Sequence, residues 1–214
     1  MSFVNPLTAG SLVLVAAVGQ AEGARAAAAA LSCAVAAIDA SPLFVDVGGR
    51  QPRPALLASA AAQKLEERVG AHLPAVKVAA RGQVCHLSVP ADVDGLASAA
   101  AAATVARGAM VVLHLPPELL GSAVAGAGGL RPSGALLRAD LAADRPLVAL
   151  AVRGLLGEGL AVGVLKHRLG WVAERRALFG ALPAGAAGGL SDRLVRRLGL
   201  SRDTEIRFPV PAAV

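Results

Sequence analysis

Short apolar runs alternate with helical segments along the first half of the chain. The run Leu12–Val18 consists of Leu, Val and Ala, a composition typical of a strand covered on both faces. After a short loop that contains glycine, Ala24–Ile38 has high helix propensity and few polar residues, Arg25 and Ser32, which predicts a largely buried helix. A strand, a tight loop and a helix in this order form the first half of a βαβ unit, and the amino end of such a helix attracts anions.

The same alternation continues along the rest of the chain. We expect strands at Leu43–Val47, Val76–Ala80, Val84–Val89, Met110–Leu115, Leu147–Val152 and Glu205–Val210. We expect helices at Pro54–Val69, from an Asp92 or Asp94 cap to Arg107, at Leu137–Ala142, at Val172–Leu182 and at Asp192–Leu198. The glycine-rich segment Gly121–Gly134 predicts a loop or a poorly regular connection, and Leu155–Gly180 is ambiguous because Leu160–Leu165 fits either a strand or a helix.

Strands that alternate with helices predict an α/β fold, a three-layer αβα domain with a mainly parallel sheet. No linker rich in Pro, Ser or charge divides the chain, so we expect residues 1–214 to form one domain. Right-handed crossovers place a ligand crevice at the carboxyl ends of the strands, which carry Gly19, Asp46, Pro90 and His114.

Composition and charge restrict the classes of partner and compartment. The net charge of +6 is compatible with nucleic acid or an anionic membrane as a partner, but acidic residues are interleaved with the basic ones and aromatic residues make up only 2%. The cysteines Cys33 and Cys85 lie in apolar surroundings without ligand spacing, which favours two buried thiols over a zinc site or a disulfide. The first ten residues lack the basic start of a signal peptide, and no apolar run reaches the length of a membrane span, so we expect a cytoplasmic protein.

Four ordered motifs within Leu12–Leu120 carry a family resemblance: VLVAAVGQAEGARAAAAAL, PLFVDVGG, VCHLSVPADVDGL and MVVLHLPPELL. Their order and spacing resemble the MinD/ParA family of deviant Walker P-loop ATPases, and within it the CpaE/TadZ branch of pilus-assembly proteins. The resemblance implies a P-loop NTPase-like fold of the SIMIBI type, with a nucleotide at the loop after the first strand and dimerisation through the same face.

The residues at the family's nucleotide positions depart from its pattern. The positions that the resemblance assigns to a cofactor are Gly19, Gly23, Ala24, Arg25, Ala26 and Asp46. Ala24 replaces the second glycine of G-x-x-x-x-G-K-[ST], Arg25 replaces the lysine, and Ala26 replaces the hydroxyl residue that holds Mg²⁺. His114 stands where the family has the Walker B aspartate, and a neutral imidazole is a poor ligand for a hard cation.

These departures predict a protein that does not hydrolyse ATP, because phosphoryl transfer depends on charge stabilisation by Lys and Mg²⁺. Binding of ATP or ADP remains open, since the backbone and Arg25 could hold a phosphate. Against it, Glu22 would repel a triphosphate, or could itself satisfy the amino end of the helix together with Arg25. We therefore expect no cofactor and no metal. None of the four histidines has metal-ligand spacing, and Ser88 is interpreted as a hydrogen-bonding core residue.

Three functions follow, in order of preference. The first is a catalytically inactive scaffolding or protein-interaction component of a bacterial cell-envelope, pilus or positioning system. This protein would be a homodimer with an unidentified protein partner. It would be peripheral to the inner membrane only through its partners. Its partner surface would be Gly19–Arg25, Asp46 and His114–Pro117, and an exposed loop arginine predicts that Arg25→Ala leaves folding largely intact. The second is a nucleotide-binding switch with slow or no hydrolysis, and the third is a partition-type protein that binds DNA without sequence preference.

Overall fold

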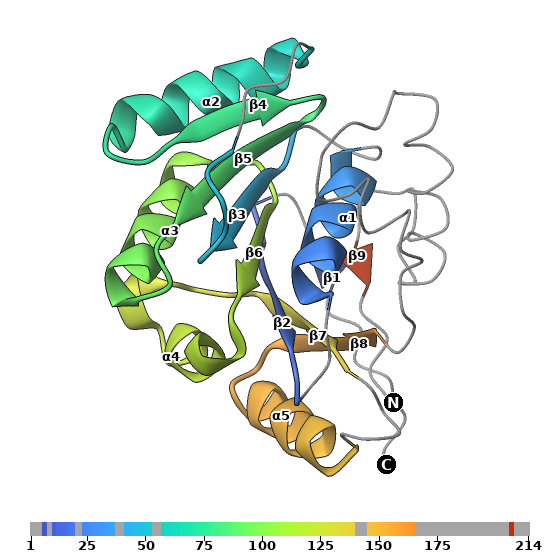
Figure 1. Cartoon of the computed structure of the whole chain (residues 1–214). Helices are drawn as coiled ribbons and strands as arrows, with labels where there is room; N and C mark the ends of the chain where they lie inside the picture. Colours follow the sequence, from blue (N-terminus) through green and yellow to red (C-terminus); the bar gives the residue numbers. More distant parts are fainter. Residues whose placement is uncertain are drawn as a thin grey trace.

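The computed structural model describes residues 6–7, 10–19, 23–36, 41–52, 57–139, 145–165 and 206–207. Its centre is a seven-stranded sheet of order β4-β5-β3-β6-β2-β7-β8 (Figure 1). The strands are β4 (Val78–Arg81), β5 (Val84–Val89), β3 (Leu43–Val47), β6 (Val111–Leu115), β2 (Leu12–Ala17), β7 (Gly134–Arg138) and β8 (Ala161–Leu165). Neighbouring strands are parallel except for β4, which pairs antiparallel with β5. The fold is therefore α/β with Rossmann/P-loop-like topology, as predicted.

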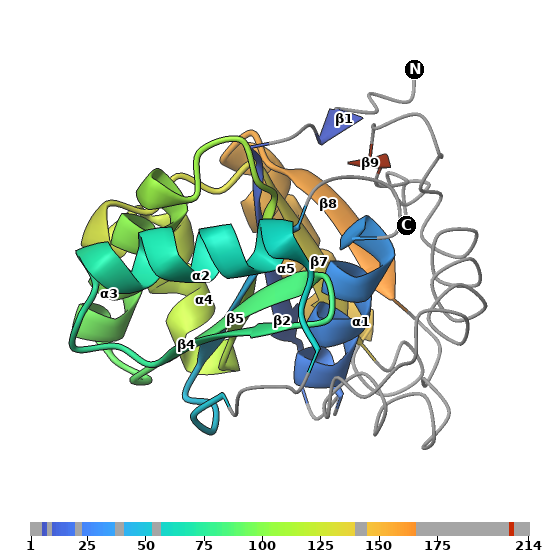
Figure 2. The same cartoon turned by 90° about the horizontal axis from the view of Figure 1, so that it is seen from above.

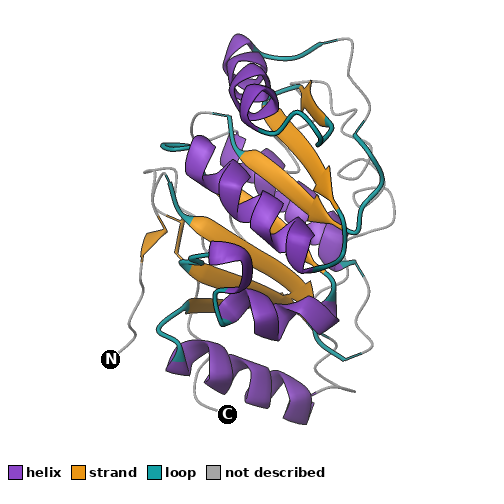
Figure 3. Cartoon of the chain, turned by 90° about the vertical axis from the view of Figure 1, so that its left-hand side faces the viewer, coloured by secondary structure: helices purple, strands orange, loops and turns teal. Residues whose placement is uncertain are grey.

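Helices cover both faces of this sheet in a three-layer αβα arrangement. The helices are α1 (Ala24–Ala36), α2 (Ala60–His72), α3 (Val93–Val105), α4 (Leu120–Val124) and α5 (Arg145–Gly157). Apolar residues of α2, α3, α4 and α5 form one core with the sheet, and Figure 3 is seen from the side of these helices. Helix α1 forms a second core with the other face, and Figure 2 shows α1 and α3 on opposite sides of the strands.

The alanine content of α1 allows it to lie deep in the molecule. Residues 26–30 are all alanine and all buried, and they pack with Val13, Val15 and Val112 of the sheet. Because alanine has no side chain beyond Cβ, such a helix can approach a sheet closely, and a helix that is apolar all round is a buried one. The predicted first strand and buried helix are confirmed.

Two predicted elements after Gly121 are wrong in type. Residues 137–142 were expected to be helical, but Leu137 lies in strand β7, where every residue is buried. Residues 147–152 were expected to be a strand, but they lie within α5, which buries Val148, Val152 and Leu155 on one helical face. A short run of Ala, Leu and Val can form either a buried strand or a helix. In α5 the buried residues recur every three to four positions, which is the spacing of a helix.

Two further boundaries differ. Helix α2 begins at Ala60 rather than at Pro54, because the Ser59 hydroxyl accepts a hydrogen bond from the Ala62 amide and caps the helix there. The segment 121–134 is a poorly regular connection, one of the two predicted alternatives, and contains most of the short helix α4 and a 3-10 turn at Ala127–Gly129. Helix α3 ends at Val105 rather than at Arg107, while its predicted cap is confirmed, since Asp92 accepts from the Gly95 amide at 2.7 Å.

The last part of the chain is described only at Ile206–Arg207 (β9), which pairs antiparallel with Pro6–Leu7 (β1). The helices predicted at 172–182 and 192–198 lie outside the described residues, and the ambiguous run 160–165 contains strand β8. In the described part of the chain, every helix is too short or too polar to cross a membrane.

Candidate functional site

Polar side chains gather on the α1-facing side of the sheet, near the carboxyl ends of three neighbouring strands. In the sheet register, Asp46 of β3 lies opposite Ser88 of β5 and opposite His114 of β6. His86 lies one step earlier on β5, opposite Phe44. The predicted convergence of Asp46 and His114 at one edge of the sheet is therefore confirmed, and their neighbours on β5 join them.

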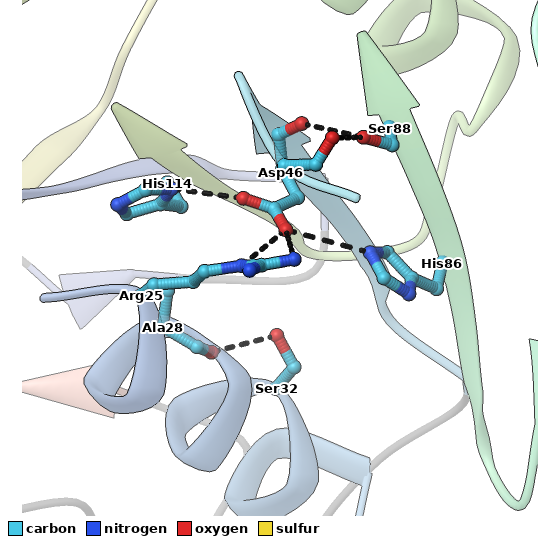
Figure 4. A network of polar contacts seen from close by, with 8 residues as sticks. Arg25, Ala28, Ser32, Asp46, His86, Ser88 and His114 are labelled. Atoms are coloured by element: carbon cyan, nitrogen blue, oxygen red, sulfur yellow. Dashed lines mark hydrogen bonds and ion pairs between the residues drawn. The ribbon is translucent and has the colours of Figure 1, made fainter. Parts of the chain in front are cut away.

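Asp46 is the centre of this cluster, with a side chain that is 0% exposed (Figure 4). Arg25, in the first turn of α1, donates from Nε to Oδ2 at 2.5 Å, and its Nη2 forms an ion pair with the same oxygen. His114 Nδ1 lies 2.9 Å from Oδ1. Since an ionised carboxylate only accepts hydrogen bonds, Nδ1 is the donor, and this fixes the tautomer of a neutral His114. Both oxygens of Asp46 are therefore satisfied from within the chain.

The backbone after Asp46 turns tightly over the carboxylate. Gly48 has φ +73°, and its amide donates to the Val89 carbonyl at 2.9 Å. The Ser88 hydroxyl donates to the Gly49 carbonyl at 2.9 Å and lies 3.3 Å from the Asp46 carbonyl, which confirms its predicted hydrogen-bonding role. A Cβ atom on Gly49 would lie 2.0 Å from Asp46 Oδ2, so position 49 has no room for a side chain while the carboxylate stays in place.

His86 faces the same carboxylate without forming a hydrogen bond to it. Its Nε2 lies 3.9 Å from Asp46 Oδ2 and has no hydrogen-bond partner, and its ring stacks on Phe44 at a centroid distance of 4.8 Å. The pKa of His86 is lowered from 6.5 to about 4: burial lowers it most and Arg81 and Arg25 also lower it, which together outweigh the opposing attraction of Asp46. His86 is therefore neutral at physiological pH.

The predicted loop residues lie around this cluster. Gly19 is exposed at the end of β2 with φ +63°, and Gly23, with φ +85°, precedes the first residue of α1, Ala24. The Ala26 methyl group is buried, being 2% exposed. Residues 20–22, and with them the expected role of Glu22, lie outside the described residues. In the described part, Arg25 pairs with Asp46.

In this arrangement the described residues offer no free ligand for the Mg²⁺ of a nucleotide. The Ala26 methyl group cannot coordinate Mg²⁺, both oxygens of Asp46 are already engaged, and the guanidinium of Arg25 is turned to the protein interior. Among the described residues, no group of three His, Cys, Asp or Glu side chains is placed to hold a metal ion.

The expectation that Arg25→Ala leaves folding largely intact rests on a premise that the structure contradicts. That expectation assumed a solvent-exposed loop side chain, whereas Arg25 is 35% exposed and provides the charge partner of a fully buried carboxylate. Removal of one partner of a buried ion pair leaves the other charge uncompensated, which destabilises the folded state.

Burial makes the thiols of Cys33 and Cys85 unreactive. Burial raises the pKa of the Cys33 thiol to about 11. Burial, with a smaller contribution from Glu66, raises the pKa of Cys85 to about 12. Thiols with such pKa values are almost entirely protonated at neutral pH and are poor nucleophiles.

His86 and Gly49 are the site residues that the sequence analysis missed. The alternation in VCHLSV places His86 and Ser88 on one face of a strand, and the glycine pair after Asp46 marks a tight turn. Neither signal identifies Asp46 as the group that these residues contact, because the contact depends on which strands are neighbours.

Comparison with models of known protein families, with curated proteins and with solved structures finds no match to this chain. The topology places it among mainly parallel α/β proteins of Rossmann/P-loop type.

Proposed function

We propose that this chain is a non-hydrolysing protein of MinD/ParA-like, SIMIBI-type fold that serves as an interaction or scaffolding component of a bacterial cell-envelope, pilus or positioning system. The observation that carries the proposal is the state of Asp46, whose two oxygens are bound by Arg25 and His114. Arg25 stands in the position of the phosphate-binding lysine and His114 in that of the Walker B aspartate. Both side chains thus bind the carboxylate of Asp46.

The loss of hydrolysis follows from the charges that the site lacks. Phosphoryl transfer in P-loop enzymes is accelerated by a lysine and Mg²⁺ that stabilise the charge developing on the phosphate oxygens. Here the residue in the lysine position is committed to an internal carboxylate, and the residue in the Ser/Thr position is a buried alanine. The site is held together by its own side chains, a property suited to a rigid platform.

The surface above Asp46 suits a protein partner. The loops after β3, β5 and β6 meet there, since a Cβ on Gly48 would lie 3.1 Å from Ala91 and 3.7 Å from Pro116. Gly48, Ala91 and Pro117 are exposed, while Asp46 lies beneath them and contributes no surface itself. Glycine turns, small residues and prolines expose backbone groups, and the prolines reduce the conformational entropy lost when a partner orders the loops.

The first test is whether this surface mediates a homodimer. We expect light scattering coupled to gel filtration to report a dimer for the wild type and a monomer for Pro117→Glu, which places a carboxylate on the surface. Leu150→Glu is the matched control, because Leu150 is 71% exposed on α5. A wild type that stays monomeric at all concentrations, or a dimer that survives Pro117→Glu, would contradict homodimerisation through this face.

The two alternative functions give different results in simple binding assays. A nucleotide-binding switch would be stabilised by Mg-ATP, by about 2.7 kcal/mol at a ligand concentration 100-fold above Kd. A DNA-binding partition protein would bind duplex DNA of any sequence, with an affinity that falls steeply as salt increases.

A further inference from the structure

One oxygen of Asp46 faces two basic side chains, but only one of them bonds to it. Arg25 donates to Oδ2 from Nε, while His86 Nε2 lies 3.9 Å from the same oxygen and has no hydrogen-bond partner (Figure 4). A buried polar atom without a hydrogen-bond partner is unfavourable, so such atoms are rare in folded proteins. His86 is therefore poised beside an acceptor that Arg25 occupies.

Arg25 and His86 differ in how far their side chains are exposed to solvent. The His86 side chain is 11% exposed, its ring stacks on Phe44, and its Nε2 lies just beyond hydrogen-bond distance of Oδ2. The Arg25 side chain is 35% exposed and belongs to the first turn of α1, next to Gly23. Arg25 can turn to the surface, whereas His86 and Asp46 remain inside.

We infer that Oδ2 of Asp46 has two alternative partners, Arg25 and a protonated His86, and that an anionic group that draws Arg25 to the surface transfers this oxygen to His86. The anion is a phosphate or carboxylate, for which the guanidinium is a bidentate donor. Where the pH lies below the raised pKa of His86, one proton is taken up at this side chain in the exchange, and the buried carboxylate then keeps a cationic partner. The inference goes beyond the scaffolding role, because it gives the site a response to an acidic group.

The charges that face His86 support this exchange. Asp46 of β3 favours the imidazolium, while Arg25 of α1 and Arg81 of β4 oppose it, and burial opposes it most. When Arg25 leaves, one of the two opposing cations is gone and Oδ2 is free to accept a hydrogen bond from Nε2–H. Anion binding and proton uptake are then coupled, and the coupling is reciprocal: a lower pH increases the affinity for the anion.

The experiment follows the imidazole resonances of His86 by NMR as a function of pH. In Arg25→Gln and Arg25→Met we expect the pKa of His86 to rise by about two pH units above its wild-type value, as for a histidine that gains an unopposed carboxylate. In the double variant Arg25→Gln/Asp46→Asn the rise should be largely lost, because the acceptor is no longer charged. A slowly exchanging Nε2 proton in the single variants would report the new hydrogen bond directly.

The wild type provides the second arm and does not depend on the stability of a variant. Addition of sodium pyrophosphate should raise the pKa of His86, whereas sodium chloride at equal ionic strength should not. A His86 pKa that stays at its wild-type value in the folded Arg25 variants would overturn the exchange, and one that does not respond to pyrophosphate would overturn its coupling to anions. Neither result depends on the oligomeric state, so failure here is distinct from failure of the proposed homodimer.

Discussion

A fully buried carboxylate is expensive in free energy unless cations and hydrogen-bond donors surround it. Asp46 has Arg25 on one oxygen and His114 on the other, so the desolvation of its charge is offset within the site. Such a pair adds little net stability over an apolar core of the same shape, but loss of one partner is costly because the other charge stays buried. The stability of this region therefore depends on Arg25.

We predict that Arg25→Ala lowers the free energy of unfolding by about 2 kcal/mol. This is less than for a fully buried pair, because the guanidinium is partly exposed and water can reach part of the vacated space. Urea denaturation monitored by circular dichroism measures the change. Arg107→Ala is the control, since Arg107 is exposed after α3 and its loss should change stability by less than about 0.5 kcal/mol. Equal midpoints for both variants would show that Asp46 does not need Arg25.

The lowered pKa of His86 predicts a loss of stability in mild acid. The folded state holds His86 neutral down to about pH 4, whereas in the unfolded chain the group takes up a proton below about pH 6.5. The unfolded state therefore binds more protons in this window, and stability falls as the pH decreases from 6.5 to 4, by up to about 3 kcal/mol from this residue.

The contribution of His86 is isolated by comparison with His86→Gln, which has no titrating group. We expect the free energy of unfolding of the wild type to decrease more steeply between pH 6.5 and pH 4 than that of the variant, in denaturant titrations at each pH. Parallel curves would mean that His86 is protonated equally in both states.

For single residues, the sequence predicts where a side chain lies in the sheet better than it predicts which group that side chain contacts. Asp46 and His114 were expected at one edge of the sheet, because each ends a buried strand. The direction of Arg25 could not be predicted, since the family pattern suggests a phosphate ligand and the acceptor is 21 residues away. The role of His86 depends on the pairing of β5 with β3, which no local pattern specifies.

Among the elements, the turn after β3 covers the carboxylate of Asp46. Its two glycines, Gly48 and Gly49, let the chain reverse over the Asp46 carboxylate. The Ser88 hydroxyl donates a hydrogen bond to the Gly49 carbonyl, and the Gly48 amide donates one to the Val89 carbonyl. This turn therefore acts as a cover for the buried charge.

We predict opposite effects for alanine at two glycines. Gly49→Ala should destabilise the fold by about 2–3 kcal/mol, because the new methyl group would overlap Oδ2 and displace it from Arg25. Gly70→Ala in α2 should stabilise the fold by about 0.5 kcal/mol, because its Cβ would meet no other atom and alanine favours the helix. Thermal unfolding of both variants gives the comparison. Similar melting temperatures would mean that the carboxylate can move aside freely.

The elements that the sequence predicted correctly are those with strong local signals. Strands β2, β3, β5 and β6 are apolar runs bounded by glycine, proline or aspartate, and Asp92 caps α3 as its position suggests. The types of β7 and α5 were assigned in reverse, because Ala, Leu and Val are abundant in both and their helix or strand character is set by packing against β2 and β8. Alanine-rich composition weakens the periodic signal that separates the two.

In the whole molecule, the strand order assembles the site from distant parts of the chain. β3 lies between β5 and β6, so residues 46, 88 and 114 become neighbours although they are far apart in sequence. Helix α1 lies on the same face and brings Arg25 to them. The fold class could be predicted because strands alternate with helices along the sequence. The contacts of Arg25 and His114 with Asp46 could not be predicted, because they depend on the three-dimensional structure.

Arg25 and His114 are bound to Asp46, and we propose that these side chains replace the charges that a nucleotide would bring. This proposal can be examined by isothermal titration of the purified protein with ATP, with and without Mg²⁺, at protein concentrations in the range of hundreds of micromolar, because weak binding then also gives heat. We expect no Mg²⁺-dependent binding heat for the wild type. Binding of ATP that strengthens with Mg²⁺ would overturn the proposal, because it would require Asp46 to exchange Arg25 and His114 for a metal-bound nucleotide.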